Sequence, residues 1–202
     1  MTAGELRARN LRTVGALAAL FVLPLVIAFF SYYGSAWRPA GHVNHGTLIT
    51  PPLPLPAIPL PRVSFGRADA AAVRTAAVRG KWTLLYIGDG ACDAACREAL
   101  YVMRQTRLAL NNDMTRVERT FLVTAHCCAR EFLSREHAGL VVLDAGSPAA
   151  EPLLREFSAA PEAHLLYIVD PLGNLVMSYD ARTDPHGLLE DLKKLLRLSH
   201  IG

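Results

Sequence analysis

Residues 80–96 read GKWTLLYIGDGACDAAC and carry the strongest indication of the fold. The apolar run Trp82–Ile87 is bounded by Gly80 and Gly88, a pattern typical of a strand that is buried on both faces. The turn after Gly88 leads into a predicted helix from Asp93 to Leu110, where apolar side chains recur on one face. A buried strand that passes directly into a helix indicates an α/β domain.

The segments on both sides of this stretch continue the alternation of helices and strands. Before it, the Ala-rich run Ala68–Arg79 favours a helix that ends at Gly80. After it, periodicity and turn residues predict a strand at Arg119–Ala125, a helix at Ala129–His137, a strand at Leu140–Leu143, a helical turn at Pro152–Phe157, a hairpin of Leu165–Val169 with Leu175–Tyr179, and a last helix that starts at Pro185 with Asp184 as N-cap. Together they predict an α/β fold with a mixed central sheet.

Cys92 and Cys96 lie where the predicted strand passes into the helix. Their spacing places both thiols on one side of the helix start, where the helix N-terminus favours the thiolate, the form that attacks disulfides and binds soft metals. Asp89 and Asp93 flank the turn, and a carboxylate there raises a thiol pKa and opposes this effect. A structural disulfide or two small core residues is the alternative. The strand-to-helix position favours a functional pair.

A second cluster, His126-Cys127-Cys128, follows the next predicted strand. It is expected at the same edge of the sheet as the start of the Cys92 helix, so that His126 and Cys128 point toward a shared pocket. Three interpretations stay open: a purely structural role, an alternative set of metal ligands (His126, Cys128), or a thiol pair that resolves Cys92 and Cys96. Four cysteines permit three complete pairings, and the sequence does not choose among them.

The N-terminal region predicts a membrane anchor. From Val14 to Tyr33 twenty residues carry no charge, which is enough for a helix to cross a hydrocarbon core of roughly 30 Å. Arg7, Arg9 and Arg12 precede this run, and the positive-inside rule then exports everything downstream. We therefore predict one span in the inner (cytoplasmic) membrane, with the C-terminal domain on the periplasmic side. A cleaved signal peptide, with Gly34-Ser35-Ala36 as its cleavage site, is the alternative.

The expected division of the chain is a cytoplasmic N-terminus (1–12), a transmembrane helix (13–33), a Pro-rich linker (34–61) and one soluble domain (62–202). The linker is expected either as an extended spacer or as a strap whose apolar residues pack on the domain. His42 and His45 within it are candidate metal ligands or solvent-facing linker residues. The net charge of +3 arises from 21 basic and 18 acidic residues that are interspersed, which argues against nucleic acid as a partner.

Two motifs of this chain resemble the SCO family of cytochrome c oxidase assembly proteins, which lies within the thioredoxin-like superfamily. The first is Gly80–Gly88 running into Cys92-x-x-x-Cys96, since SCO proteins have a GK-x-x-LLYFG-like strand followed by a C-x-x-x-C pair. The second is Tyr167–Gly173 (YIVDPLG), which is similar to the Y-L-I-D-P-x-G hairpin of that family. The resemblance covers roughly Gly80 to Leu198 and implies a thioredoxin-like domain.

The resemblance also implies a copper site. SCO proteins bind copper with the two cysteines and a histidine just before the hairpin, so the implied ligands here are Cys92, Cys96 and His164. His164 stands closer to the hairpin turn than the family histidine does. Two thiolates and an imidazole suit copper(I). The implied partners are the cytochrome c oxidase subunit that holds the copper site and other assembly factors.

The leading hypothesis is therefore a membrane-anchored, exported thioredoxin-like factor that assists cytochrome c oxidase assembly, by copper delivery or by thiol redox control of the copper site. Such a protein is a metallochaperone or assembly factor more than an enzyme. One alternative is a thiol–disulfide oxidoreductase without bound metal, with Cys92 and Cys96 as catalytic residues. Another is a redox-inactive thioredoxin-fold scaffold in which the cysteines are structural.

Overall fold

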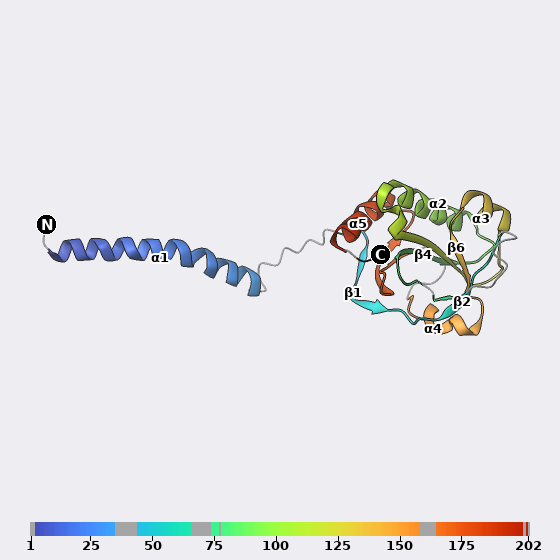
Figure 1. The fold of residues 1–202 in the computed structure, drawn as a ribbon, viewed down its shortest axis with the longest axis horizontal. Coiled ribbons are helices and arrows are strands. Elements are labelled where there is room, and N and C mark those ends of the chain that lie inside the picture. The colour runs from blue at the N-terminus through green and yellow to red at the C-terminus, as the bar shows by residue number, and fades with distance from the viewer. Residues whose placement is uncertain are drawn as a thin grey trace. The chain divides into compact units, whose positions relative to one another are not determined.

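The structure is a computed structural model that describes residues 3–34, 44–65, 74–76, 78–157, 165–199 and 201 (Figure 1). The chain divides into two compact units, Met1–Val43 and Asn44–Gly202. The expectations for His42 and His164 lie outside the described residues.

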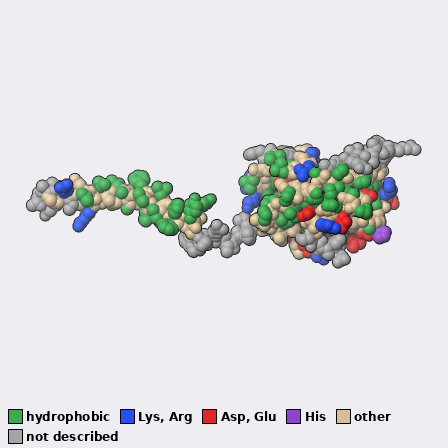
Figure 2. Space-filling model, turned by 90° about the horizontal axis from the view of Figure 1, so that it is seen from below, with side chains coloured by type: hydrophobic (Ala, Val, Ile, Leu, Met, Phe, Trp, Pro, Cys, Tyr) green, Lys and Arg blue, Asp and Glu red, His purple; other side chains and the backbone are tan. Residues whose placement is uncertain are grey.

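The first unit contains helix α1 (Ala3–Tyr33). Its segment Arg9–Tyr33 has a mean hydropathy of 2.5 and is 0% buried, so it is long and apolar enough to span a membrane. Apolar side chains, coloured green in Figure 2, follow the helix beyond a basic N-terminal end. Exposed side chains such as Leu17, Phe21 and Ile27 have no protein core to cover them within this unit. The predicted candidate span is thus confirmed as a helix.

The second unit is built on a six-stranded mixed sheet in the order β1-β8-β7-β4-β5-β6. Its strands are β1 (Thr47–Pro54), β4 (Trp82–Gly88), β5 (Val117–Val123), β6 (Val141–Asp144), β7 (Leu165–Val169) and β8 (Asn174–Asp180). Strands β4, β5 and β6 run parallel, whereas β7, β8 and β1 add antiparallel pairings. All seven residues of β4 are buried, which explains its continuous apolar sequence. The predicted α/β fold with a mixed sheet is confirmed.

One face of this sheet is covered by helices. Helices α2 (Ala94–Ala109), α3 (Arg130–Glu136) and α5 (Pro185–Leu198) contribute apolar side chains to a core with Leu84 and Tyr86 of β4. A 3-10 helix, η3 (Asn111–Arg116), follows α2. Because side chains alternate along a strand, Leu85 and Ile87 point to the opposite face and join a second core.

The second face is covered largely by the Pro-rich segment and by the short elements η4 (Pro148–Ala150) and α4 (Glu151–Leu154). Leu55 and Leu60 are 3% and 0% exposed, and they pack with residues such as Leu153. The segment therefore corresponds to the strap alternative from residue 44 onward. It also forms the edge strand β1, which suits prolines because an edge strand need not donate every N–H to a ladder.

The strap also explains why one predicted helix is wrong. Strand β2 (Pro59–Pro61) pairs antiparallel with β3 (Arg74–Ala76), which lies inside the Ala-rich run that favoured a helix. Pairing with a neighbouring segment overrides the weak local preference of alanine for helix. Residues 68–73 and 77 of that run lie outside the described residues.

A buried carboxylate holds the start of the strap against helix α5. Asp191, 4% exposed, accepts hydrogen bonds from the backbone N–H groups of His45 (2.7 Å) and Gly46 (3.1 Å) and from the Tyr179 hydroxyl. Burial is the main cause that raises the pKa of Tyr179, and its bond to Asp191 adds to the effect. A side chain at Gly46 would collide with the Tyr179 ring, so only glycine fits here.

Candidate functional site

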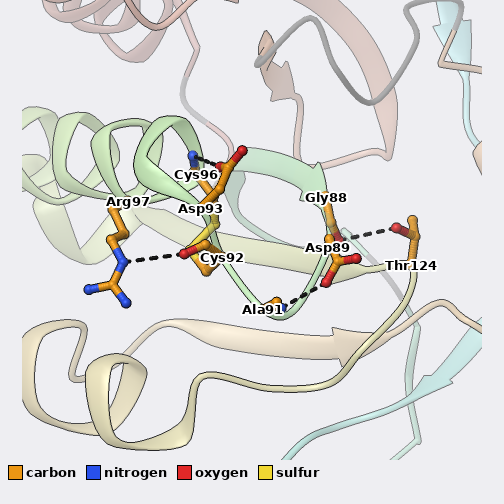
Figure 3. Close-up of a disulfide and its surroundings, with 8 residues drawn as sticks. All are labelled: Gly88, Asp89, Ala91, Cys92, Asp93, Cys96, Arg97 and Thr124. Carbon is orange, nitrogen blue, oxygen red and sulfur yellow. Dashed lines mark hydrogen bonds between the residues drawn. A yellow bond between two sulfur atoms is a disulfide. The ribbon is translucent and has the colours of Figure 1, made fainter.

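Cys92 and Cys96 are joined by a disulfide at the point where β4 gives way to α2 (Figure 3). Their Cα atoms are 5.1 Å apart, within the usual range for a disulfide. Each residue is 2% exposed and belongs to the core between the sheet and the helices. Cys92 has a φ of 51°, a left-handed conformation that turns the chain sharply between strand and helix. The predicted pair is brought together, and it is buried.

Two carboxylates fix the turn that presents this pair. Asp89 accepts a hydrogen bond from the Ala91 N–H (2.8 Å), and Asp93 caps α2 by accepting one from the Cys96 N–H (2.9 Å). Asp93 therefore caps the same turn of α2 in which Cys96 lies. Burial, and then the charge of Asp93, raises the pKa of Tyr86 to about 12, so this tyrosine is a neutral core residue.

Arg97 closes the site on the side of the helices. Its Nε donates a hydrogen bond to the Cys92 carbonyl oxygen (3.2 Å), as Figure 3 shows. Its guanidinium lies 4.3 Å from the centroid of the Phe132 ring on α3. An open groove between α2 and α3 is lined by Arg97, Ala129 and Phe132, among others. The groove thus borders the residues that directly follow Cys96 and Cys128 in the chain.

The second cysteine pair lies on the neighbouring loop, after β5. Cys127 and Cys128 form a disulfide with each other, so the four cysteines pair as Cys92–Cys96 and Cys127–Cys128. Cys127 is exposed, whereas Cys128 is half-buried and packs against the core that contains Cys92 and Cys96. The observed bonding agrees with a structural role and equally with a thiol pair that resolves Cys92 and Cys96.

Gly90 forms a backbone contact between the two loops that carry the cysteine pairs. Its N–H donates to the Ala125 carbonyl (2.8 Å), and its own carbonyl accepts from the Ala129 N–H (2.8 Å). A Cβ atom at this position would come within 2.8 Å of the Cys127 Cα and of the His126 carbonyl oxygen. The absence of a side chain is what allows this close approach.

An ion pair joins the same two loops at the surface. His126 Nδ1 lies 2.7 Å from Asp89 Oδ2, with 78% and 48% of the two side chains exposed. The bond to Asp89 raises the pKa of His126. The pKa of Asp89 is lowered, first by the hydrogen bond from Ala91 and then by His126. His126 is therefore held beside the Cys92 turn and favours its charged form.

Of the remaining candidate ligands, the structure describes His45. His45 bonds to Asp184 (3.2 Å) and Glu190 (3.0 Å) at the start of α5, so it is not a free linker residue. His42 and His164 lie outside the described residues. Within the part of the chain that the structure describes, no group of three or more His, Cys, Asp or Glu side chains is arranged to hold a metal ion.

Two contributors to the site were missed by reasoning from the sequence, Gly90 and Arg97. The Gly-Asp-Gly sequence of the turn signals an unusual backbone, but the loop that Gly90 contacts is about thirty-five residues further along the chain. Arg97 carries no signal, since its partners are a backbone carbonyl and a ring on another helix.

The site offers the chemistry of two disulfides on loops that contact each other, and of the thiols that form when they are reduced. Reduction of Cys92–Cys96 would leave two sulfur ligands at a helix N-terminus, where the thiolate form is favoured. Thiolates are soft ligands that suit copper(I). In the disulfide form the same sulfurs are oxidants that exchange with incoming thiolates.

A family model described as "Transmembrane-like, thioredoxin-like, C-terminal domain" matches residues 82–199. No curated protein matches the sequence significantly. Among solved structures, the chain is similar to apo Sco1 from Thermus thermophilus, with a TM-score of 0.57 and 19% identity, over 78% of this chain and 99% of that chain. The residues that the family model matches include Trp82–Cys96 of the first sequence motif and the whole of the second, Tyr167–Gly173.

Two further structures extend this similarity. One is ScoI from Bradyrhizobium japonicum with copper bound, with a TM-score of 0.53 and 20% identity, over 71% of this chain and 99% of that chain. The other is BsSco, a Sco-family cytochrome c oxidase assembly protein with an identified disulfide switch, with a TM-score of 0.53 and 17% identity, over 75% of this chain and 99% of that chain. At these identities the likeness is one of fold. The predicted thioredoxin-like fold and its resemblance to Sco proteins are confirmed at that level.

Proposed function

Because the chain belongs to the family of transmembrane-like, thioredoxin-like C-terminal domains, we propose that it is an SCO-like factor in cytochrome c oxidase assembly. It acts through Cys92 and Cys96, which hold copper(I) as thiolates and cannot hold it as the disulfide. The observation that carries the proposal is the bonded cysteine pair at the capped start of α2. Copper is cargo in this proposal, passed on to the oxidase subunit that holds the copper site.

Two of the three proposed ligands suit copper(I). Cys92 and Cys96 supply two sulfurs at one point, and soft sulfur ligands select copper(I). The third ligand in this proposal is His164, on the resemblance of its position to the histidine of SCO proteins. The alternative ligands His126 and Cys128 lie on the loop that contacts the Cys92 turn through Gly90, and the proposal leaves them out of the copper site.

Copper(I) titration of the full-length chain in detergent, under anaerobic conditions after reduction, tests the proposal. We expect tight binding of one ion, with large losses of affinity in Cys92→Ser and Cys96→Ser and a smaller loss in His164→Ala. His45→Ala is the matched histidine control, since His45 bonds to Asp184 and Glu190 on α5, and it should leave the affinity unchanged. Absence of tight binding, or binding that is indifferent to both cysteines, would contradict the copper form of the proposal.

A second candidate function is a thiol–disulfide oxidoreductase without bound metal. It is favoured by the second disulfide, Cys127–Cys128, on a loop that contacts the Cys92 turn through Gly90. Such an enzyme should exchange readily with a thiol pool and turn over a disulfide substrate. A measured reduction potential for Cys92–Cys96, together with a turnover assay in copper-free buffer, separates the two candidates.

We also propose that α1 is a retained anchor that places the second unit on the periplasmic side of the inner membrane. Support comes from the apolar length of Arg9–Tyr33 and from the basic residues Arg7, Arg9 and Arg12. Mass spectrometry of the mature protein tests this directly: an N-terminus that retains α1 agrees with the proposal. An N-terminus that begins near Ser35–Trp37 would show a cleaved signal peptide instead.

A further inference from the structure

The structure assigns a role to Cys127–Cys128: we propose that this exposed pair accepts electrons from a dithiol protein and passes them to the buried Cys92–Cys96 disulfide. The inference rests on the proposed function, because copper(I) binding requires Cys92 and Cys96 to be reduced. It adds the route by which that reduction takes place.

The two cysteine pairs differ in their exposure to solvent. Cys92 and Cys96 are each 2% exposed, so the thiolate of another protein has little access to either sulfur. Thiol–disulfide exchange requires direct attack on a sulfur atom, and its rate depends on access. Cys127 is exposed, whereas Cys128 is half-buried against the core that contains the other pair. An incoming thiolate therefore reaches Cys127 first.

Proximity makes transfer between the pairs feasible. Gly90 exchanges backbone hydrogen bonds with Ala125 and Ala129, one on each side of Cys127–Cys128, and a Cβ atom on Gly90 would lie 2.8 Å from the Cys127 Cα. Cys92 is two residues from Gly90, a separation that a chain covers in about 7 Å at most. A cysteine side chain on one loop is thus within a short loop movement of the other.

The transfer balances as two successive exchanges. A partner dithiol attacks the Cys127 sulfur, Cys128 leaves as a thiolate, and the partner's second thiol completes its own disulfide. The Cys128 thiolate then attacks the Cys92 sulfur, the Cys92–Cys96 bond breaks, and Cys96 leaves as a thiolate. Attack of Cys127 on the Cys128 sulfur re-forms Cys127–Cys128 and frees Cys92. Two electrons and two protons pass from the partner dithiol to Cys92 and Cys96.

The test is the rate at which the full-length, oxidised chain in detergent is reduced by reduced thioredoxin, a small dithiol protein. Alkylation at timed intervals, followed by peptide mass spectrometry, reports each cysteine pair separately. We expect Cys127–Cys128 to open before Cys92–Cys96, and the Cys127→Ser/Cys128→Ser variant to reduce Cys92–Cys96 at least about tenfold more slowly. Ser134→Ala, an exposed change on α3, should leave both rates unchanged. Equal rates in the double variant and the wild type would overturn the inference.

A second variant keeps the inference testable if the loop does not tolerate two serines. Cys96→Ser/Cys127→Ser retains only Cys92 and Cys128, which oxidised glutathione should join in a disulfide between the loops. The matched variant Cys96→Ser/Cys128→Ser retains Cys92 and the outward Cys127, and should form that link more slowly. Absence of the Cys92–Cys128 bond would overturn the transfer step.

The same preparations separate this inference from the proposed function. After chemical reduction, Cys127→Ser/Cys128→Ser should bind copper(I) as the wild type does. Copper binding that is intact while the thioredoxin rates are equal overturns only the electron route. Loss of copper binding in the chemically reduced wild type overturns the proposed copper function.

Discussion

Cys92–Cys96 and Cys127–Cys128 lie at the same edge of one sheet, but they are built into the domain in different ways. The first pair follows β4, is almost fully buried, and shares the first turn of α2 with the cap Asp93. The second follows β5 on an exposed loop that contacts the turn of the first through Gly90 and through the His126–Asp89 ion pair. The difference teaches that a cysteine pair held by a helix start is suited to store a ligand or a redox state, and a pair on an exposed loop is suited to meet a partner.

The largest expected contrast between the pairs is in copper(I) affinity. Cys92→Ser/Cys96→Ser removes both soft ligands of the proposed site and should weaken copper(I) binding more than about 100-fold. This loss exceeds the roughly 10- to 100-fold loss of metal affinity that follows removal of a residue that only supports a ligand. Cys127→Ser/Cys128→Ser should change the affinity less than about threefold, because it leaves that site intact. Competition with a copper(I) chelator of known affinity measures both. Comparable losses in the two variants would indicate that the pairs form one joint metal site.

Gly90→Ala should test the contact that joins the two pairs. The new methyl group would come within 2.8 Å of Cys127 Cα, the His126 carbonyl oxygen and Val123 Cγ1, two of them backbone atoms that cannot rotate away. Overpacking of this kind costs about 2–3 kcal/mol of unfolding free energy. Gly88→Ala is the comparison, since the atoms nearest its Cβ would be those of the Tyr86 side chain, at 3.0 Å and beyond, and its loss of stability should be smaller. Urea denaturation of the oxidised proteins measures both, and an unchanged midpoint for Gly90→Ala would show that the loops are not packed together.

The two disulfides should also differ in how much they stabilise the fold. Replacing Cys92 and Cys96 by alanine removes a cross-link of five residues that lies within the core, and should cost about 2 kcal/mol. The same replacement at Cys127 and Cys128 removes a link between adjacent residues on an exposed loop, and should cost less than about 1 kcal/mol. Thermal unfolding of both variants beside the oxidised wild type provides the measurement. A larger loss at Cys127 and Cys128 would show that the loop disulfide stabilises the fold more than the core disulfide does.

The smallest expected effect concerns the helix cap beside Cys96. Asp93→Ala removes the acceptor of the Cys96 N–H and should cost about 1 kcal/mol of stability, and Asp184→Ala, which uncaps α5, should cost a similar amount. Only a change at Asp93 should alter the redox chemistry. Asp93→Asn removes a negative charge beside the sulfurs, favours the thiolates, and should raise the reduction potential of Cys92–Cys96. Equal potentials in Asp93→Asn, Asp184→Ala and the wild type would show that the cap does not tune the pair.

Local patterns predicted much of this domain. The continuous apolar run at Trp82–Ile87 and the N-cap Asp184 followed by Pro185 each determine structure within a few residues, and both elements occur where expected. The strand-to-helix position of Cys92 and Cys96 is likewise a local signal, so the pair was found without a structure.

The parts that were not predicted depend on contacts between distant segments. The pairing of β2 with β3 overrides an Ala-rich helix signal, and the burial of Leu55 and Leu60 depends on the second face of a sheet formed later in the chain. Asp191 holds His45 from almost 150 residues away, at a sequence separation of 146. The bond between Cys127 and Cys128 was one of three pairings that the sequence permitted.

The central claim, that Cys92 and Cys96 act in oxidase assembly, is tested most directly by the copper content of cytochrome c oxidase in cells that lack this chain. The account predicts that its loss lowers the copper content of the oxidase, that the wild-type chain restores it, and that Cys92→Ser/Cys96→Ser, produced at the same level in the membrane, does not. Full restoration of the copper content by the Cys92→Ser/Cys96→Ser variant would contradict the account and would leave the cysteines with a structural role.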